Sequence, residues 1–230
     1  MKLGIMQPYF FPYAQQFRHI AQCDQWIVFD TVKFSRKSWT SRNRVANRDT
    51  EWGYISVPVA KGATNGTIAQ AEIGQTDWRS TFFNQLRSYE TVAPYYLQTI
   101  GILRNCIEAD VDTLGTLNTR ILRTIASSLG IQTEIKRLSE MELELPTAAE
   151  PGEWALIISK QMGASVYSNA PGGRHLFDSD RYLKNGVTLE FYEPAPLEYP
   201  TVGLPFVPDL AVIDTLMWLG RDGVSQFVLS

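Results

Sequence analysis

At the start of the chain, the pattern of hydrophobic and polar positions changes from that of a strand to that of a helix and back to that of a strand. Residues 2–6 form a short apolar run, and two prolines then predict an extended, aromatic-rich loop over residues 7–13. Phe17 and Ile20 fit one face of a following helix, and residues 26–29 read as a second buried strand. This order is typical of a βαβ unit, whose parallel strands end at the same edge of a sheet. Because open α/β sheets bind ligands at that edge, we expect the active or binding site there.

The remaining pattern completes an α/β chain. Residues 52–59 alternate as a strand does, and residues 67–73 are expected to return beside them in a β-hairpin. Residues 77–130 read as a helical segment that begins at an Asp77 cap. Further strands are predicted over residues 131–136, 163–167 and 187–192, and further helices over residues 154–162 and 206–219. The predicted fold class is α/β, with a Rossmann-like parallel or mixed sheet, flanking helices and a small hairpin insertion.

Composition fits one globular α/β domain over residues 1–230, in which residues 33–75 form a basic loop and hairpin covering the proposed site. Net charge of −3 argues against a nucleic-acid partner. Cys23 and Cys106 have no metal-ligand spacing and are expected to be buried, reduced thiols, which fits a cytoplasmic location. We expect no metal and no cofactor. We also expect no membrane span, because no apolar stretch approaches the length that a bilayer requires.

A cluster of basic side chains follows the second strand. It comprises Lys33, Arg36, Lys37, Arg42, Arg44 and Arg48. Guanidinium forks bind phosphate or carboxylate, so this cluster predicts a small-molecule substrate carrying such a group, clamped by Lys37 and Arg42. Trp39 and Asn43 are expected to contact the same substrate. A solvated loop, or a loop paired with the acidic stretch of residues 140–153, is the alternative.

Several other side chains are candidates for chemistry at the sheet edge. Asp30 ends a buried strand and can act as a base or orient a substrate, although capping or pairing with Lys37 or Arg42 is an equally good interpretation. His175 follows the Gly172-Gly173 turn, where backbone can approach a ligand closely, and is a candidate general base. His19 is expected on a helix surface or packed within the fold. No dinucleotide fingerprint, phosphate loop or nucleophile elbow occurs.

The loop after the first strand carries one amide and two phenols at Gln7, Tyr9 and Tyr13. Aromatic walls with a hydrogen-bonding amide suit a sugar ring or a planar base. We therefore expect these three side chains to bind substrate.

Motifs along nearly the whole chain together resemble the WbqC-like family. They are residues 6–13, residues 28–34, Trp39 with residues 42–44, Gly163 to Tyr167, Gly172-Gly173, residues 206–210 and Ile213-Asp214. The resemblance implies a bacterial protein of polysaccharide, O-antigen or related glycan assembly, and acyl or aminoacyl transfer to an amino sugar is the expected reaction. The family usually has another residue at the position of His175, which argues against a catalytic role for this histidine. The residues we expect to matter most for function are therefore Gln7, Asp30, Lys37, Arg42 and Asn43.

Three functions are therefore expected in order of preference. The first is a transferase acting on a nucleotide-linked or phosphorylated sugar. The second is a non-catalytic scaffold that docks an acyl carrier protein through the basic loop. The third is nucleotidylyl transfer, because the first 40 residues are similar in layout to pantothenate synthetase. That family's phosphate-binding histidine pair is missing from residues 11–17, so we expect no pyrophosphate release.

Overall fold

The computed structural model describes residues 1–146 and 149–230, and its centre is a parallel five-stranded sheet. The strands lie in the order β5-β2-β1-β6-β7. Their bounds are Lys2–Met6 for β1, Gln25–Val28 for β2, Glu134–Arg137 for β5, Val166–Asn169 for β6 and Thr188–Phe191 for β7. The predicted α/β class with a parallel sheet is confirmed, and so is the opening βαβ unit, in which Ile5 pairs with Ile27.

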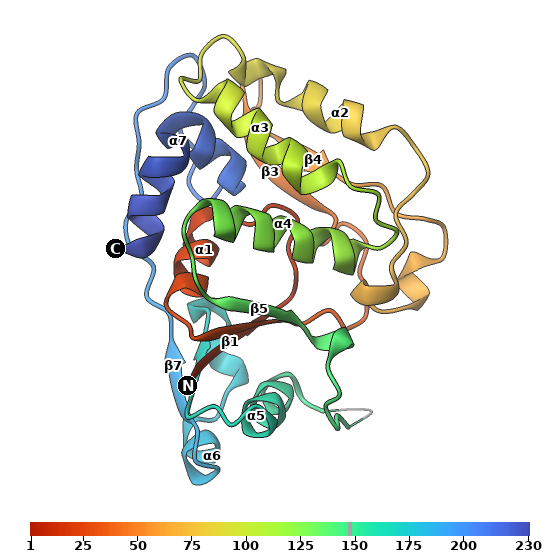
Figure 1. Ribbon diagram of the computed structural model, residues 1–230, viewed down its shortest axis with the longest axis vertical. Helices are drawn as coiled ribbons and strands as arrows, with labels where there is room; N and C mark the ends of the chain where they lie inside the picture. The colour runs from red at the N-terminus through yellow and green to blue at the C-terminus, as the bar shows by residue number, and fades with distance from the viewer. Residues whose placement is uncertain (147–148) are drawn as a thin grey trace.

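Helices cover both faces of this sheet (Figure 1). One face packs on α1, α4 and α7, and the other on α5 and α6, so two separate apolar cores form. The bounds are Ala14–Ala21 for α1, Leu114–Ser128 for α4, Pro151–Gln161 for α5, Ser179–Lys184 for α6 and Val212–Leu229 for α7. Packing on β1 is tight: a Cβ on Gly4 would lie 2.3 Å from the Trp26 ring. No helix in the described residues combines the length and apolarity needed to cross a membrane.

The strand order places a topological switch point between β1 and β6. The chain runs outward from β1 through β2 to β5, then returns to the other side of β1 for β6 and β7. At such a point neighbouring connections leave toward opposite faces, so a crevice opens beyond the carboxyl ends of the two strands. Met6 and Asn169 end the strands that border this crevice.

A second lobe lies beyond α4 and contains the hairpin, α2 and α3 (Figure 1). Its helices are Trp78–Gln85 for α2 and Tyr96–Ile107 for α3, and the Asp77 carboxylate caps α2 by accepting from the Ser80 amide. α2 is shorter than the predicted pattern, because the chain tightens into a 3₁₀ turn at Arg87–Tyr89.

The hairpin differs from the one predicted. β3 (Arg42–Asn47) pairs antiparallel with β4 (Glu51–Ser56), so the partner strand comes from the basic segment. The predicted pairing of residues 52–59 with residues 67–73 is wrong apart from a single bridge between Val59 and Ile73. Thr67 and Gln70 form a capping box that winds this segment into a 3₁₀ turn.

Two buried asparagines, Asn43 on the hairpin and Asn118 on α4, hold the loop of residues 7–13. The Asn118 amide donates to the carbonyls of Pro8 and Thr40 at 2.8 and 2.7 Å, and the Asn43 amide donates to those of Phe10 and Phe11. Its two prolines lack backbone donors and interrupt a strand ladder, so only isolated backbone bonds form, such as that from the Phe10 amide to the Trp39 carbonyl. Side-chain amides therefore fix its path.

We predict that Asn118→Ala lowers the free energy of unfolding by roughly 2–4 kcal/mol, because two buried carbonyls lose their donor. Asn105→Ala, on the exposed side of α3, is the matched control and is expected to change stability by less than about 0.5 kcal/mol. Urea titration measures both. Equal stability of the two variants would show that the Asn118 bridge does not hold the loop.

Candidate functional site

A cavity of about 710 Å³ opens at the switch point. Its walls come from the ends of β1, β6 and β7, the first turns of α1, and the hairpin lobe. Typical small-molecule sites occupy about 300–1,000 Å³, so the space is large enough for more than a single sugar ring. The expected position of the site, at the carboxyl edge of the sheet, thus contains a cavity.

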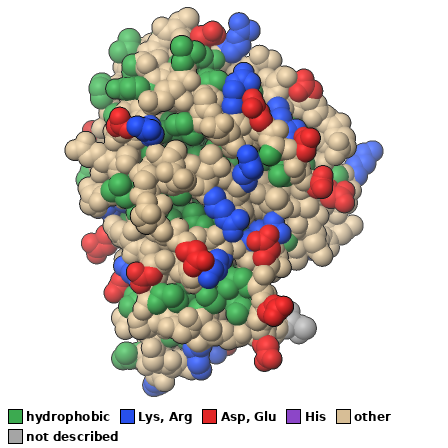
Figure 2. Space-filling view, viewed as in Figure 1, with side chains coloured by type: hydrophobic (Ala, Val, Ile, Leu, Met, Phe, Trp, Pro, Cys, Tyr) green, Lys and Arg blue, Asp and Glu red, His purple; other side chains and the backbone are tan. Residues whose placement is uncertain are grey.

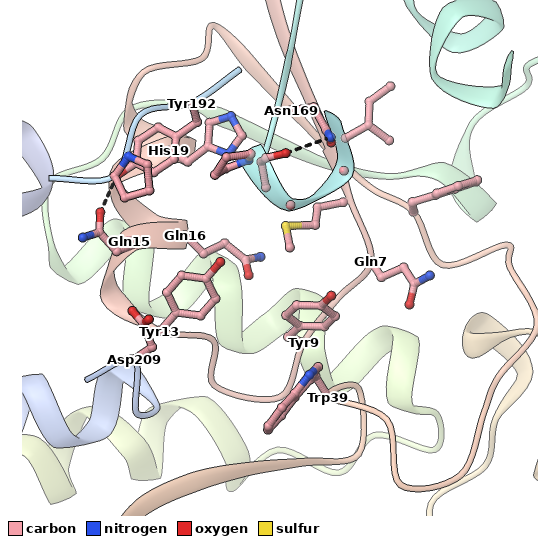
Figure 3. Close-up of a pocket in the computed structure, with 18 of the residues that line it drawn as sticks. Gln7, Tyr9, Tyr13, Gln15, Gln16, His19, Trp39, Asn169, Tyr192 and Asp209 are labelled. Atoms are coloured by element: carbon pink, nitrogen blue, oxygen red, sulfur yellow. Dashed lines mark hydrogen bonds between the residues drawn. The ribbon is translucent and has the colours of Figure 1, made fainter. Parts of the chain in front are cut away.

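Seven of the predicted site residues line this cavity: Gln7, Tyr9, Tyr13, Trp39, Asn43, Gly172 and Gly173. The two glycines belong to a 3₁₀ turn at Pro171–Leu176, where a Cβ on Gly173 would lie 2.5 Å from the Asn169 amide nitrogen. The N-terminal loop, the hairpin lobe and the glycine turn therefore meet around one space, as Figure 3 shows for the labelled side chains.

Asp30 does not line the cavity. Its carboxylate is fully buried at the end of β2, where it accepts from the backbone and hydroxyl of Ser139 and pairs with Arg137 at 3.2 Å. Burial raises the pKa of Asp30, and the Ser139 hydrogen bonds and Arg137 oppose that shift. The carboxylate thus joins β2 to β5, on the side away from β6. Of the two interpretations of Asp30, the structure thus favours a structural ion pair, but the partner is Arg137 and not Lys37 or Arg42.

Lys37, Arg42 and His175 also lie outside the cavity lining. Lys37 is exposed at a loop tip with φ of +60°, and Arg42 stacks on the Tyr54 ring. His175 is exposed on the glycine turn, of which Pro171, Gly172, Gly173 and Leu176 line the cavity. Arg44 is the basic residue that reaches the cavity, two positions along β3 from the expected clamp.

The acidic stretch does not neutralise the basic segment. Glu140 pairs with Arg137, and Glu153 pairs with Arg181. Within the described residues no ion pair involves the basic segment, and Thr147 and Ala148 of the acidic stretch lie outside that description. Across the face in Figure 2, basic and acidic side chains are interspersed.

Gln16 is the unexpected member of the site. Its side chain is 2% exposed, yet neither its amide oxygen nor its nitrogen has a hydrogen-bond partner in the described structure. Figure 3 shows this amide among the labelled cavity residues, with Tyr13 and Tyr9 on one side and His19 on the other. A buried, unpaired amide costs free energy unless a ligand pairs with it. Gln16 therefore brings an unused donor and an unused acceptor to the cavity wall.

Its neighbour Gln15 is fully paired. The Gln15 amide donates to the Ala195 carbonyl and accepts from the Tyr192 hydroxyl at 2.5 Å. The Tyr192 ring stacks on His19, with ring centroids 4.7 Å apart. Gln15 and Tyr192 thus form a rigid wall beside the unpaired amide.

His19 is buried and neutral at the back of the cavity. Its Nε2 is 2.9 Å from the Ser168 hydroxyl. Burial, with a smaller contribution from Lys2, lowers the pKa of His19 to about 4. A histidine with this pKa carries no charge near neutral pH, so we expect it to orient Ser168 and Tyr192 instead of serving as a base.

The phenols and one carboxylate define the polar side of the cavity. Burial raises the pKa of Tyr9, and it raises that of Tyr13 to about 12 with help from Tyr9, Asp209 and Tyr192. Both phenols are therefore hydrogen-bond donors at neutral pH. Asp209 is the one carboxylate among the described lining residues, and its backbone adopts a left-handed φ of +55°. The loop before α7 thus delivers an exposed acid to the site.

Asn43 lines the cavity but its amide is committed. Besides its bonds to Phe10 and Phe11, its oxygen accepts from the Arg44 backbone at 2.8 Å. The structure therefore places it as a support for the N-terminal loop. The described residues contain no group of three or more potential metal ligands, and both cysteines are buried with pKa values that burial raises to about 12.

Comparison with known proteins decides the family. The model of the WbqC-like protein family matches residues 7–226, nearly the whole chain. The chain belongs to the WbqC-like family. The matched range includes every side chain of the site discussed above.

This WbqC-like protein is 25% identical over 225 residues to the uncharacterized protein Rv1507c of Mycobacterium tuberculosis. The matched region covers 96% of this chain and 95% of that relative. No solved structure matches the chain. The site therefore has to be interpreted from its own geometry.

We predict that Gln16→Met leaves the free energy of unfolding unchanged or raises it, because the substitution removes a polar group that has no partner. Gln15→Met is the matched control on the same helix turn. It is expected to lower stability by about 1–3 kcal/mol, since Tyr192 and Ala195 lose their partner. Thermal unfolding compares them. Equal losses in both variants would mean that the Gln16 amide is already satisfied in the free protein.

The His19 environment predicts a specific acid sensitivity. Below its usual pKa of about 6.5 the unfolded histidine binds a proton, whereas the buried one does so only near pH 4, so stability falls as pH drops between these values. The loss is on the order of 3 kcal/mol at pH 4. We expect His19→Gln to flatten this part of the stability profile and His175→Gln, at the exposed histidine, to leave it intact. Urea denaturation from pH 4 to pH 7.5 tests this, and matching slopes for the two variants would refute it.

Proposed function

We propose that this WbqC-like protein is a transferase that binds a nucleotide-linked or phosphorylated sugar in the switch-point cavity, in bacterial glycan assembly. The observation that carries the proposal is the unpaired Gln16 amide, buried between phenols and facing that space. An amide offers a donor and an acceptor together, which matches a sugar hydroxyl or an acetamido group. Gln7 adds a further amide on the same lining.

The aromatic side chains supply the remaining contacts. Tyr9, Tyr13 and Tyr192 present apolar ring surface with a hydroxyl at one end. Sugar rings have apolar C–H faces and polar edges, so such a wall can pack against one and hydrogen-bond the other. Arg44 is available for the anionic part of the substrate.

Asp209 is the candidate base. Besides the main cavity, it borders a smaller one of about 290 Å³, with Tyr13 and Gln15 as shared walls. A carboxylate between two spaces is suited to accept a proton from one substrate as it attacks the other. In acyl or aminoacyl transfer, the sugar amine would form a bond to the acyl carbon. The bond to the donor's oxygen or sulfur would break with its electron pair, and Asp209 would accept the amine proton.

A specific observation also favours contact with a carrier protein. Lys33, Arg36, Lys37 and Arg48 are exposed, and none forms an ion pair within the described residues. An acidic acyl carrier docked there would deliver a donor near the hairpin. This second function is compatible with transfer and is the alternative to it if the cavity binds no small molecule.

We expect Asp209→Asn to retain sugar-conjugate binding and to lower acyl-transfer turnover by about 100-fold or more, as loss of a general base does. Glu198→Gln, in the smaller cavity, is the matched control and should keep turnover. Mass spectrometry detects acylated product from amino-sugar nucleotides incubated with acyl thioesters. Calorimetry measures binding, with Gln16→Met expected to bind at least 10-fold more weakly. Absence of sugar-conjugate binding by the wild-type protein would refute the proposal.

A further inference from the structure

Two arginines and three aromatic rings form a row along the hairpin and the residue Trp39 just before it. The Arg42 guanidinium lies 4.1 Å from the Tyr54 ring centroid, and the Tyr54 and Trp52 rings contact edge to face at 5.2 Å. The Arg44 guanidinium then lies near two indoles, 5.2 Å from the Trp52 ring centroid and 5.6 Å from that of Trp39. We call these five side chains the hairpin ladder. Only its Trp39–Arg44 end lines the cavity.

The two guanidinium groups of the ladder carry uncompensated charge. Among the described residues neither forms an ion pair, and the Nε of each is buried without a hydrogen-bond partner. Arg44 contacts Asp209 only through its backbone carbonyl, at 3.4 Å. Cation–π contact with two rings restricts the Arg44 guanidinium and covers part of it from water, which favours bidentate contact with an anion.

An exposed indole stands beside this cation. Trp39 is 40% exposed although it forms part of the cavity wall. Its backbone carbonyl accepts from the Phe10 amide at 2.8 Å, which brings the loop carrying Tyr9 alongside it. Figure 3 shows the Tyr9 and Trp39 rings as neighbours on one side of the cavity. Two aromatic rings next to a fixed guanidinium suit a planar base joined to phosphate.

We propose that the hairpin end of the cavity binds the nucleoside diphosphate part of the substrate, with the base against Trp39 and the diphosphate on Arg44. The inference rests on the proposed function, because it divides one substrate between the Gln16 end and the ladder end. A sugar carrying only a monophosphate would leave the indole uncovered. The substrate class is therefore a nucleoside diphosphate sugar, and Trp39 is a specificity-determining residue.

The ladder provides two matched pairs of variants for testing this. Trp39→Ala and Tyr54→Ala each remove a ring that is about 40% exposed and stacked on an arginine, but only Trp39 lines the cavity. Arg44→Gln and Arg42→Gln each remove an unpaired charge from β3, but only Arg44 lines the cavity. Calorimetry with uridine, adenosine and guanosine diphosphates as probes, and with inorganic pyrophosphate, measures their affinities. Thermal unfolding confirms that the members of each pair are equally folded.

We expect at least one nucleoside diphosphate to bind more tightly than pyrophosphate. Trp39→Ala should weaken that binding by about 10-fold and remove the preference over pyrophosphate, whereas Tyr54→Ala should change it less than about 2-fold. Arg44→Gln should weaken both ligands by about 10-fold or more, and Arg42→Gln should weaken neither by as much. Equal effects within either pair, or no preference over pyrophosphate, would overturn the inference.

A sugar 1-phosphate and a nucleoside diphosphate sugar separate this inference from the function on which it rests. Binding of sugar 1-phosphate that depends on Gln16, without binding of any nucleoside diphosphate, would refute the nucleotide site and leave the sugar site standing. Nucleoside diphosphate binding that depends on Trp39 and gains nothing from an attached sugar would support the nucleotide site and refute the sugar site.

Discussion

The bonds from Asn43 and Asn118 to the N-terminal loop are the constraint on which the site depends. The loop leaves the central strand with Pro8 and Pro12, which supply no donors, and with Phe11 in a left-handed conformation at φ of +46°. Three of its carbonyls nevertheless find side-chain donors: Asn43 donates to Phe10 and Phe11, and Asn118 donates to Pro8 and also to Thr40 beside the loop. The carboxyl edge of the sheet, where the cavity lies, is thereby coupled to the second lobe. Neither unit alone defines the positions of Tyr9 and Tyr13.

This coupling explains how polar groups are distributed in the cavity. Asn43 and Gln15 use both ends of their amides and Asn118 uses its nitrogen, whereas neither end of the buried Gln16 amide has a partner in the described structure. Retaining such an amide reduces stability, and proteins commonly accept that cost at binding sites. The carboxylates divide in the same way. Asp30 is hydrogen-bonded to Ser139 and paired with Arg137, whereas Asp209 is exposed on a loop with a left-handed φ.

Sequence patterns predicted the site's position better than its chemistry. The opening strand, aromatic loop, helix and strand followed from periodicity, and that order alone indicates the sheet edge where Gln7, Tyr9 and Tyr13 lie. Local sequence does not show which strands will be neighbours in the sheet. Asp30 was therefore expected at the site, whereas in the structure β2 lies beside β5 and Asp30 pairs with Arg137 there. Arg42 and Arg44 are equivalent in pattern, and only the hairpin's docking separates them. Gln16 carried no signal, because an amide in a helix is usually solvated, and Asp209 stood out only as part of the family motif at residues 206–210.

The sheet order has a consequence for biogenesis. β1 emerges first during synthesis and finds β2 soon afterward, but its other neighbour, β6, is made only after all of the second lobe. Until then the central strand has a bare hydrogen-bonding edge, which is a template for association with other chains. The nascent polypeptide must therefore keep this edge covered while most of its length is still being translated, and premature termination anywhere before Val166 would leave it permanently open.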